Sequence, residues 1–376
     1  MFQMKTSEPV SEEVNLSSMG VTDTEIVIGS SAALSGHAGT LGTNYLHGAM
    51  AYINQVNEDG GIHGRTIRVV SYDDMYNPPQ TVANTQKLIN EDKVFLLFNY
   101  VGTPTTLKII PIVEEAKIPL VGIFSGAQVL RVPFRKNIFS IRASYFQETE
   151  TAIQHYTKTL GLKKIAVFYQ SDAYGIDGLE GTKRSLQKYG LEPVALGTYN
   201  RGTMDVEDAV ARIANSEAEA VVIVGTYGPA AKFVTLMKDR KPDMYFHSVS
   251  FVGTEEFVKE LGDNTSRVCI TEVVPSLAEA GLPDFLLKYE ERLQKYYPDD
   301  EVTFGGVEGY VNTKVILDAL QNAGATPTRE GFVKALESYQ DESGLGIEFS
   351  KNDHQGLDTV YLIQIQNGKY TRMYTE

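Results

Sequence analysis

Short apolar runs alternate with amphipathic segments along most of the chain, and this order occurs twice. The first unit consists of an apolar strand at 25–29, a glycine-rich loop at 30–42, a helix at 44–57 and a strand at 66–72. The helix carries apolar side chains at spacings of three and four. A similar unit begins at residue 164. Strands that alternate with helices predict parallel sheets, and two such series predict two Rossmann-like α/β lobes with a cleft between them.

The remaining pattern extends both lobes. For the first lobe we predict further strands at 94–98, 119–123 and 137–142, and helices at 79–90 and 105–116. For the second we predict strands at 164–169, 192–199, 220–224, 245–250 and 267–273. Helices near 147–160, 176–189, 205–215, 228–239 and 253–260 accompany these strands.

The last hundred residues follow a different pattern. Three helical segments without strands between them come after Val274, and we expect them to cover the first sheet. Two alternating runs around Asn367-Gly368 then predict a hairpin that completes the second lobe. The predicted organisation is therefore an N-terminal tether (1–20), lobe 1 (21–143 plus 275–346) and lobe 2 (144–274 plus 347–376). The chain crosses between the lobes about three times, near Ala143, Val274 and Gly346, which predicts a hinge.

Composition and charge limit the function. The 376 residues are 42% apolar, enough for two hydrophobic cores. A net charge of −14 without a basic stripe argues against nucleic acid or an anionic membrane as a partner. No apolar run approaches the roughly 20 residues that span a bilayer. The polar first 20 residues have no signal-peptide core. We interpret them as a disordered tether at the start of a mature protein that has been trimmed of its signal.

Motifs for catalysis are missing. The single cysteine, Cys269, lies in an apolar run, and no histidine or cysteine cluster has the spacing of a metal site. The glycines at 36–42 do not form a dinucleotide fingerprint, and neither a Walker loop nor a GxSxG elbow is present. Asp73-Asp74 are best explained as caps of the following turn. We therefore expect no enzyme, no cofactor and no metal.

Candidate binding residues lie where the strands end, since ligands of open α/β sheets bind outside the carboxyl ends of the strands. Glycines and hydroxyls follow the first-lobe strands, where they expose N–H groups that suit a carboxylate. Tyrosines follow the second-lobe strands, where they suit a lid over an apolar ligand. The first-lobe candidates are Tyr100, Val101, Gly102, Thr103, Ser125, Gly126, Ala127 and Gln128. The second-lobe candidates are Asp172, Tyr174, Thr226, Tyr227, Ser250 and Phe251.

Several stretches together resemble one family. They are IVIGSSAALSG, GAMAYINQVNEDGGIHGR, the run from Asp73 to Leu88, the GTPTT loop, KIPLVGIFSGA, KIAVFYQSDAYG and EGYVNTKVILDAL. From about Thr24 to Met373 the chain resembles the type I periplasmic binding proteins of ABC transporters, in the leucine/isoleucine/valine-binding branch. The resemblance implies two hinged lobes that close over a small ligand, no catalysis, and delivery to a membrane permease. It further implies a monomer that is periplasmic or anchored outside the cell as a lipoprotein. It also implies that the loops at Gly102-Thr103 and 125–128 hold the ligand carboxylate, with Tyr174 and Tyr227 closing from the second lobe.

Some positions depart from the family pattern. Amino-acid binders of this branch place a carboxylate against the ligand ammonium, and Ser250 stands at that position here. Gln128 replaces a threonine contact, and Leu41 replaces an aromatic residue near the first loop. Two interpretations stay open. Asp172 takes over the ammonium, or the ligand is an aromatic or short aliphatic carboxylate without an α-amino group.

The leading functional hypothesis is a transport receptor for a small carboxylate, with a branched-chain or other apolar amino acid as the first candidate. One alternative is a ligand that lacks the ammonium group. Another is the same fold serving as the extracellular sensor of a signalling receptor. An enzyme on an α/β scaffold is disfavoured by the missing motifs.

Overall fold

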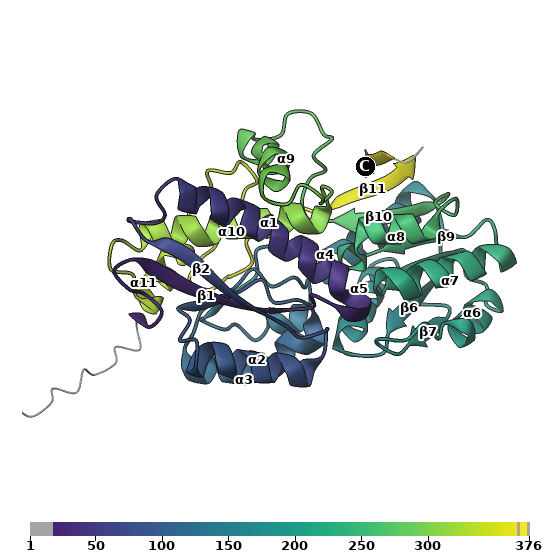
Figure 1. Ribbon diagram of the computed structural model, residues 1–376. Coiled ribbons are helices and arrows are strands. Elements are labelled where there is room, and N and C mark those ends of the chain that lie inside the picture. The colour runs from purple at the N-terminus through teal and green to yellow at the C-terminus, as the bar shows by residue number, and fades with distance from the viewer. Residues whose placement is uncertain (1–17, 367–368, 374–376) are drawn as a thin grey trace, which may run out of the picture.

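The computed structural model describes residues 18–366 and 369–373, and it contains two β-sheets that form two lobes (Figure 1). The strands of the first sheet are all parallel, in the order β2 (Thr66–Asp73), β1 (Glu25–Ala32), β3 (Leu96–Phe98), β4 (Leu120–Val121) and β5 (Ile138–Phe139). The predicted two-lobed α/β fold is confirmed. No helix in these residues has the length and apolar character needed to cross a membrane.

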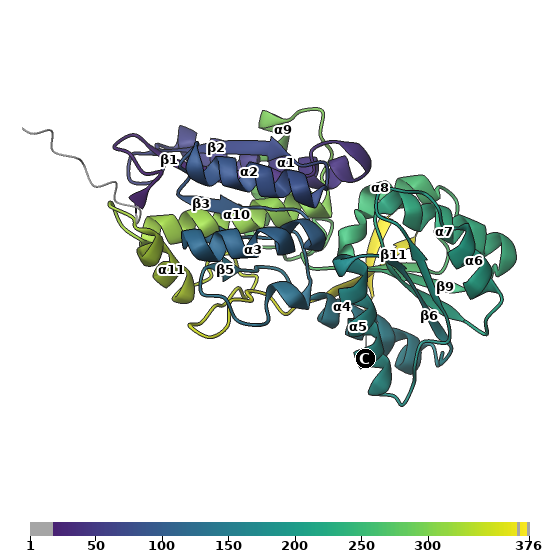
Figure 2. The same ribbon diagram turned by 90° about the horizontal axis from the view of Figure 1, so that it is seen from below.

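The first sheet lies between two layers of helices (Figures 1 and 2). One layer contains α1 (Gly39–Glu58) and α10 (Phe304–Asn322), which pack on each other, and α1 also contacts α9 (Asp284–Tyr296) while α10 contacts α11 (Arg329–Glu337). The other layer contains α2 (Pro78–Asn90) and α3 (Thr103–Ala116). Segments from both ends of the sequence therefore build the first lobe.

The second sheet is mixed. Its order is β12 (Lys369–Met373), β11 (Tyr361–Gln366), β10 (Val268–Glu272), β9 (Tyr245–Ser248), β8 (Ala220–Val224), β6 (Ile165–Gln170) and β7 (Leu196–Tyr199). Strands β10, β11 and β12 pair antiparallel, and the other pairs are parallel. Its helices are α4 (Tyr145–Gln154), α5 (Ala173–Gln187), α6 (Glu207–Ala214), α7 (Tyr227–Arg240) and α8 (Thr254–Leu261). The C-terminal strands thus join the second sheet through β10.

Several elements differ from their predicted bounds. Helix α1 begins at Gly39, whereas the pattern predicted a loop up to Gly42 and a helix from about residue 44. Gly42, one of the glycines that suggested a loop, is needed for packing, because a Cβ at this position would lie 2.0 Å from the carbonyl oxygen of Ala33. Strands β4 and β5 contain only two residues each, because their flanking residues turn away into loops.

Some predictions fall outside the described residues. Most of the predicted tether lies before residue 18, and the turn residues Asn367 and Gly368 are not described. The strands on either side of that turn pair antiparallel, with Gln366 opposite Lys369. The lobe boundaries near residues 143, 274 and 346 stay a prediction.

Candidate ligand-binding site between the lobes

The strand-end loops of both sheets lie where the lobes meet, and most predicted binding residues are buried there. The buried ones are Leu41, Tyr100, Val101, Gly102, Thr103, Ser125, Gly126, Ala127, Tyr174, Thr226, Ser250 and Phe251. The partly buried ones are Gln128, Asp172 and Tyr227. Leu41 belongs to α1, and Tyr174, Tyr227 and the short helix Ser250–Val252 belong to the second lobe. This burial requires contact between the lobes.

Five aromatic rings from both lobes form that contact. They are here named the ring cluster and belong to Tyr76, Phe124, Tyr145, Tyr174 and Phe251. Phe251 lies 5.9 Å from Tyr76, 5.2 Å from Phe124 and 4.9 Å from Tyr174, measured between ring centroids. Tyr145 lies 5.3 Å from Tyr174. Tyr76 and Phe124 follow strands of the first sheet, and the other three rings come from the second lobe. The ring cluster provides an apolar, flat-walled surrounding, as aromatic pairs in tilted and edge-on geometry do.

The predicted carboxylate loops lie directly beside these rings. A Cβ on Gly102 would be 2.1 Å from Cε2 of Tyr76, and one on Gly126 would be 2.6 Å from Cδ1 of Tyr145. Gly102 has a φ of 92° and precedes the first residue of α3. The hydroxyls of Thr103 and Ser125 lie 2.8 Å apart. Glycine is therefore required at Gly102 both for its backbone angle and for the close approach of the ring.

Two main-chain donors in these loops have no acceptor among the described residues, the N–H groups of Thr103 and Gly126. Thr103 is the first residue of α3, which has no side-chain cap. The first N–H groups of a helix carry a partial positive charge and bind anions. With the hydroxyls of Thr103 and Ser125, they form a donor set that suits a carboxylate.

The rest of the loop at 125–128 is already engaged. The Ala127 N–H donates to the Ser125 hydroxyl at 3.2 Å. The N–H groups of Gln128 and Val129 donate to the two carboxylate oxygens of Asp177 at 3.0 and 3.2 Å. Asp177 belongs to α5 of the second lobe. The predicted capture by this loop is thus limited to its first two residues, and Asp177 is a loop partner that sequence reasoning missed.

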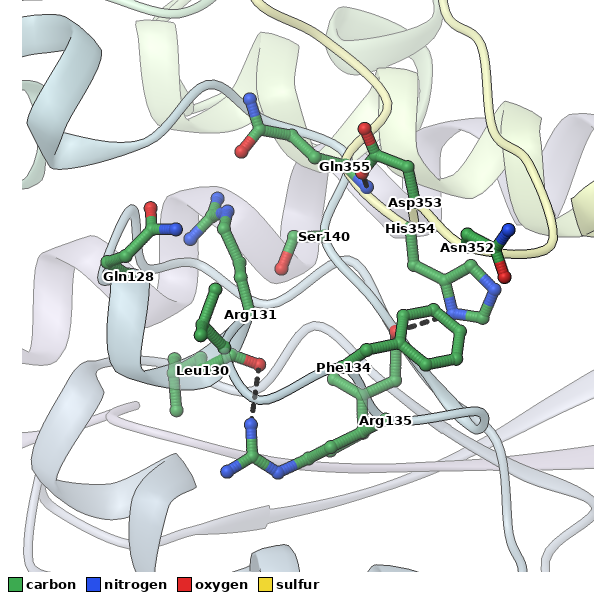
Figure 3. A pocket seen from close by; sticks show the side chains of 12 residues that line it. Gln128, Leu130, Arg131, Phe134, Arg135, Ser140, Asn352, Asp353, His354 and Gln355 are labelled. Carbon is green, nitrogen blue, oxygen red and sulfur yellow. Dashed lines mark hydrogen bonds between the residues drawn. The ribbon is translucent and has the colours of Figure 1, made fainter.

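The side chain of Gln128 lies elsewhere. It lines a cavity of about 280 Å³ between the segments 128–140 and 352–355 (Figure 3). Arg131, Phe134 and His354 also line this cavity, and no member of the ring cluster does. The role predicted for the Gln128 side chain therefore stays a prediction without support from its position.

The Asp172 carboxylate already has three partners. It caps α5 by accepting the N–H of Tyr174 at 3.1 Å, accepts from Gln170 at 2.8 Å, and forms an ion pair with Arg201 at 3.2 Å. Burial raises the pKa of Asp172, and Arg201 opposes this shift. The Arg201 guanidinium lies 5.6 Å from the centroid of the Tyr76 ring in the opposite lobe. A ligand ammonium at Asp172 would have to displace or share Arg201.

The two predicted lid tyrosines make different contacts. Tyr174 is fully buried, and its hydroxyl donates to the Gly225 carbonyl at 3.3 Å. Burial raises the pKa of Tyr227, and a hydrogen bond with Thr40 of the first lobe opposes this rise. Tyr174 thus belongs to the ring cluster, whereas Tyr227 contacts the start of α1.

Ser250 is part of a buried network, here named the ion network, with Arg142, Glu148 and Glu308. The Ser250 N–H and hydroxyl donate to Glu148 at 2.7 and 2.9 Å, and Arg142 donates to the Ser250 hydroxyl. Arg142 lies 3.4 Å from Glu148 and 3.6 Å from Glu308, and these side chains are 0, 0 and 4% exposed. The Ser250 hydroxyl is thus already used as donor and acceptor.

Electrostatics within the ion network follow from burial. Burial alone lowers the pKa of Arg142, but Glu308 and Glu148 outweigh it and raise that pKa. Burial raises the pKa of Glu148 and raises that of Glu308 to about 7, with Arg142 opposing both shifts. The sequence offered no signal for this network, because Ser250 and Glu308 lie more than 100 positions from Arg142 and Glu148 in the chain.

Comparison with known proteins decides the family. Residues 25–369 match the profile of a family described as periplasmic binding protein. The chain belongs to this family. Its type I fold and its place in the leucine/isoleucine/valine-binding branch are as predicted, and the family consists of ligand-binding receptors without catalytic activity.

Curated relatives of this periplasmic binding protein share low identity with it. An "Amino acid binding protein" of Pseudomonas aeruginosa is 28% identical over 255 residues, 67% of each chain. "Leu/Ile/Val-binding protein homolog 3" of Brucella melitensis is 21% identical over 312 residues, 83% of each chain.

A crystal structure from Rhodopirellula baltica, described as a possible leucine/isoleucine/valine-binding protein, is 29% identical, with a TM-score of 0.88 over 94% of this chain and 97% of that one. A valine-bound branched-chain amino acid ABC transporter protein from Thermus thermophilus has a TM-score of 0.85 over 94% of this chain and 96% of that one. At 18% identity, the second likeness shows the fold alone.

Proposed function

We propose that this protein is the solute-binding receptor of an ABC transporter, and that it captures a small carboxylate with an apolar body by closing its two lobes. The observation that carries this proposal is the position of the unpartnered N–H groups of Thr103 and Gly126, next to a ring cluster built by both lobes. A carboxylate accepts charge-assisted hydrogen bonds from such groups, and its apolar body contacts the rings. Both contacts depend on lobe closure.

An amino acid is the first candidate ligand. The relatives described as amino-acid-binding or Leu/Ile/Val-binding support it. Its ammonium would need an anion or several acceptors, because an unpaired buried charge costs several kcal/mol. Asp172 is the acidic side chain that we propose for this role, in competition with Arg201.

A carboxylic acid without an ammonium group is the second candidate. Two observations favour it: the Ser250 hydroxyl is engaged by Arg142 and Glu148, and Asp172 is paired with Arg201. A ring cluster without a free anion suits an aromatic or branched aliphatic acid.

The deciding experiment compares each amino acid with its deaminated analogue. Thermal shift and calorimetry would use L-leucine against 4-methylpentanoate, and L-phenylalanine against 3-phenylpropanoate. A ligand at one hundred times its Kd stabilises the folded protein by about 2.7 kcal/mol, so binding is visible as a raised Tm. If an amino acid binds, Asp172→Asn should weaken it more than tenfold. If only the plain acid binds, Asp172→Asn should change little, whereas Ser250→Glu should weaken binding.

Lobe closure is tested separately by small-angle scattering. Closure predicts a smaller radius of gyration, or a narrower distribution of sizes, at saturating ligand. Failure of all small carboxylates to raise Tm would refute the ligand class. An unchanged scattering curve with a bound ligand would refute capture by closure.

The surroundings of the receptor are part of the proposal. We propose a membrane permease as its partner and a periplasmic or lipid-anchored extracellular location. Sensing for a signalling receptor is the alternative use of the same cleft. Permease and ATPase genes beside the coding gene would support transport, and a neighbouring kinase or chemoreceptor gene would support sensing.

A further inference from the structure

Asp177 connects the second lobe to the carboxylate loop of the first lobe. It lies in the first half of α5, and its two oxygens accept the N–H groups of Gln128 and Val129 at 3.0 and 3.2 Å. These N–H groups belong to the first two residues of the short helix Gln128–Leu130, directly after the loop that contains Ser125 and Gly126. One buried carboxylate thus holds the loop from across the interlobe cleft.

The Asp177 carboxylate depends on these two hydrogen bonds, because it is 9% exposed and has no ion pair within 4.0 Å among the described residues. A buried carboxylate without these two N–H groups would be left with unsatisfied acceptors. Burial raises the pKa of Asp177, and the two N–H groups and the nearby Arg131 oppose this shift. Separating the lobes would break the contact.

The other side of the loop is attached to the crossover between the lobes. Arg131 donates to the Ala127 carbonyl at 2.8 Å and to the Arg142 carbonyl at 3.0 Å. Arg142 lies next to the predicted hinge at Ala143. The end of the loop is therefore tied to the crossover in its own lobe and to Asp177 in the opposite lobe.

We propose that Asp177 is a positioning residue, which holds the loop Ser125–Gln128 in its carboxylate-binding shape when the second lobe closes. This inference rests on the proposed function, because it concerns the same loop. Asp177 does not touch the ligand in this proposal. It acts through the loop, so its effect falls on the closed complex and on the rate at which the ligand leaves.

The main test measures association and dissociation separately, by surface plasmon resonance on immobilised protein. The probe is whichever of L-leucine, L-phenylalanine, 4-methylpentanoate and 3-phenylpropanoate raises Tm. Asp177→Asn keeps the shape of the side chain, but it replaces one of the two acceptor oxygens with an NH2 group, which cannot accept a hydrogen bond from an N–H group. We expect the dissociation rate constant to rise at least fivefold and the association rate constant to change less than twofold. Asp208→Asn, an exposed change of equal charge on α6, is the matched control and should change neither.

A second variant removes the partner and leaves Asp177 in place. Gln128→Pro deletes one donor N–H, and the preceding Ala127, at φ −66° and ψ 132°, already has the backbone conformation that proline requires before it. The dissociation rate constant should rise as much as it does in Asp177→Asn. In the double variant, it should be no larger than in either single variant. An unchanged dissociation rate in both single variants, or equal changes in both rate constants, would overturn the proposal.

A third measurement needs no ligand. Spin labels on Gln80→Cys of α2 and Asp239→Cys of α7, both exposed positions, report the distance between the lobes, while Cys269 is buried. Asp177→Asn should lower the population of short distances, and Asp208→Asn should not. If none of the four probes binds, the proposed ligand class fails, and the distance distribution alone decides the role of Asp177. Identical distributions in wild type and Asp177→Asn would then refute it.

Discussion

Replacing Arg142 with methionine should strongly destabilise the protein, because it removes the cation of the ion network. Glu148 and Glu308 lie 3.4 and 3.6 Å from its guanidinium, and all three side chains are at most 4% exposed. Removing one partner of such a buried pair leaves an uncompensated charge and typically costs about 3–5 kcal/mol. We expect a loss in this range for Arg142→Met at pH 8.

The loss should depend on pH through Glu308. Burial raises its pKa to about 7, from the ordinary value of 4.5 for a glutamate. A carboxyl with a raised folded-state pKa contributes stability that is fully present below its unfolded pKa and is lost as pH rises through the folded one. For Glu308, the difference between the folded and unfolded pKa corresponds to roughly 3 kcal/mol of stability that is lost between pH 4.5 and pH 8. Near pH 5.5 Glu308 is protonated with or without Arg142, so the loss caused by Arg142→Met should shrink there.

Urea denaturation followed by circular dichroism at pH 5.5 and pH 8 measures this effect. Arg212→Met, on the exposed face of α6, is the control and should stay within about 0.5 kcal/mol of wild type. Combining Arg142→Met with Glu148→Gln and Glu308→Gln should restore much of the stability, because no carboxylate of the ion network is then left unpaired. A loss below 1 kcal/mol at pH 8, or an equal loss at both pH values, would refute the reasoning.

Three further predictions concern the site and its surroundings. Gly102→Val should abolish ligand binding in calorimetry, because a Cβ would lie 2.1 Å from the Tyr76 ring and φ is 92°; affinity within threefold of wild type would place the carboxylate elsewhere. Tyr174→Ala should weaken binding by about 1–4 kcal/mol, while Tyr174→Phe should change it little, because the hydroxyl already bonds a main-chain carbonyl. Wild-type Tm should fall between pH 5.5 and 8 as Glu255 and Glu308, whose pKa values burial raises to about 7, become charged. Glu255→Gln should make this fall smaller, and an unchanged slope would contradict the role of Glu255.

The fold could be predicted because it follows from local patterns. The alternation of apolar strands with amphipathic helices indicates parallel sheets, and the carboxyl ends of parallel strands converge at one edge. The loops at Gly102-Thr103 and Ser125 were proposed as a ligand site on this ground, and their role in binding stays a prediction. The start of α1 was missed, because Gly42 has a low helix propensity and its packing against Ala33 is not visible in the local pattern.

The partners of the site residues could not be predicted in this way. The loop at 125–128 has the composition of an anion site along its whole length, yet Asp177 occupies the N–H groups of Gln128 and Val129. Tyr76 and Phe124 lie among ordinary loop residues in the sequence, and only their proximity to Phe251 makes them part of the ring cluster.

The sequence by itself determined the order of the elements, the two-lobed plan and which loops follow the carboxyl ends of the strands, because strand and helix patterns depend on neighbours a few residues away. The tertiary structure decided which donors stay unpartnered and which charges are paired. Arg142 and Ser250 are 108 positions apart, and Ser250 and Glu148 are 102 apart. Hydrogen bonds and ion pairs require contact within a few ångströms, and for residues this distant only the packing of the two lobes brings the atoms together.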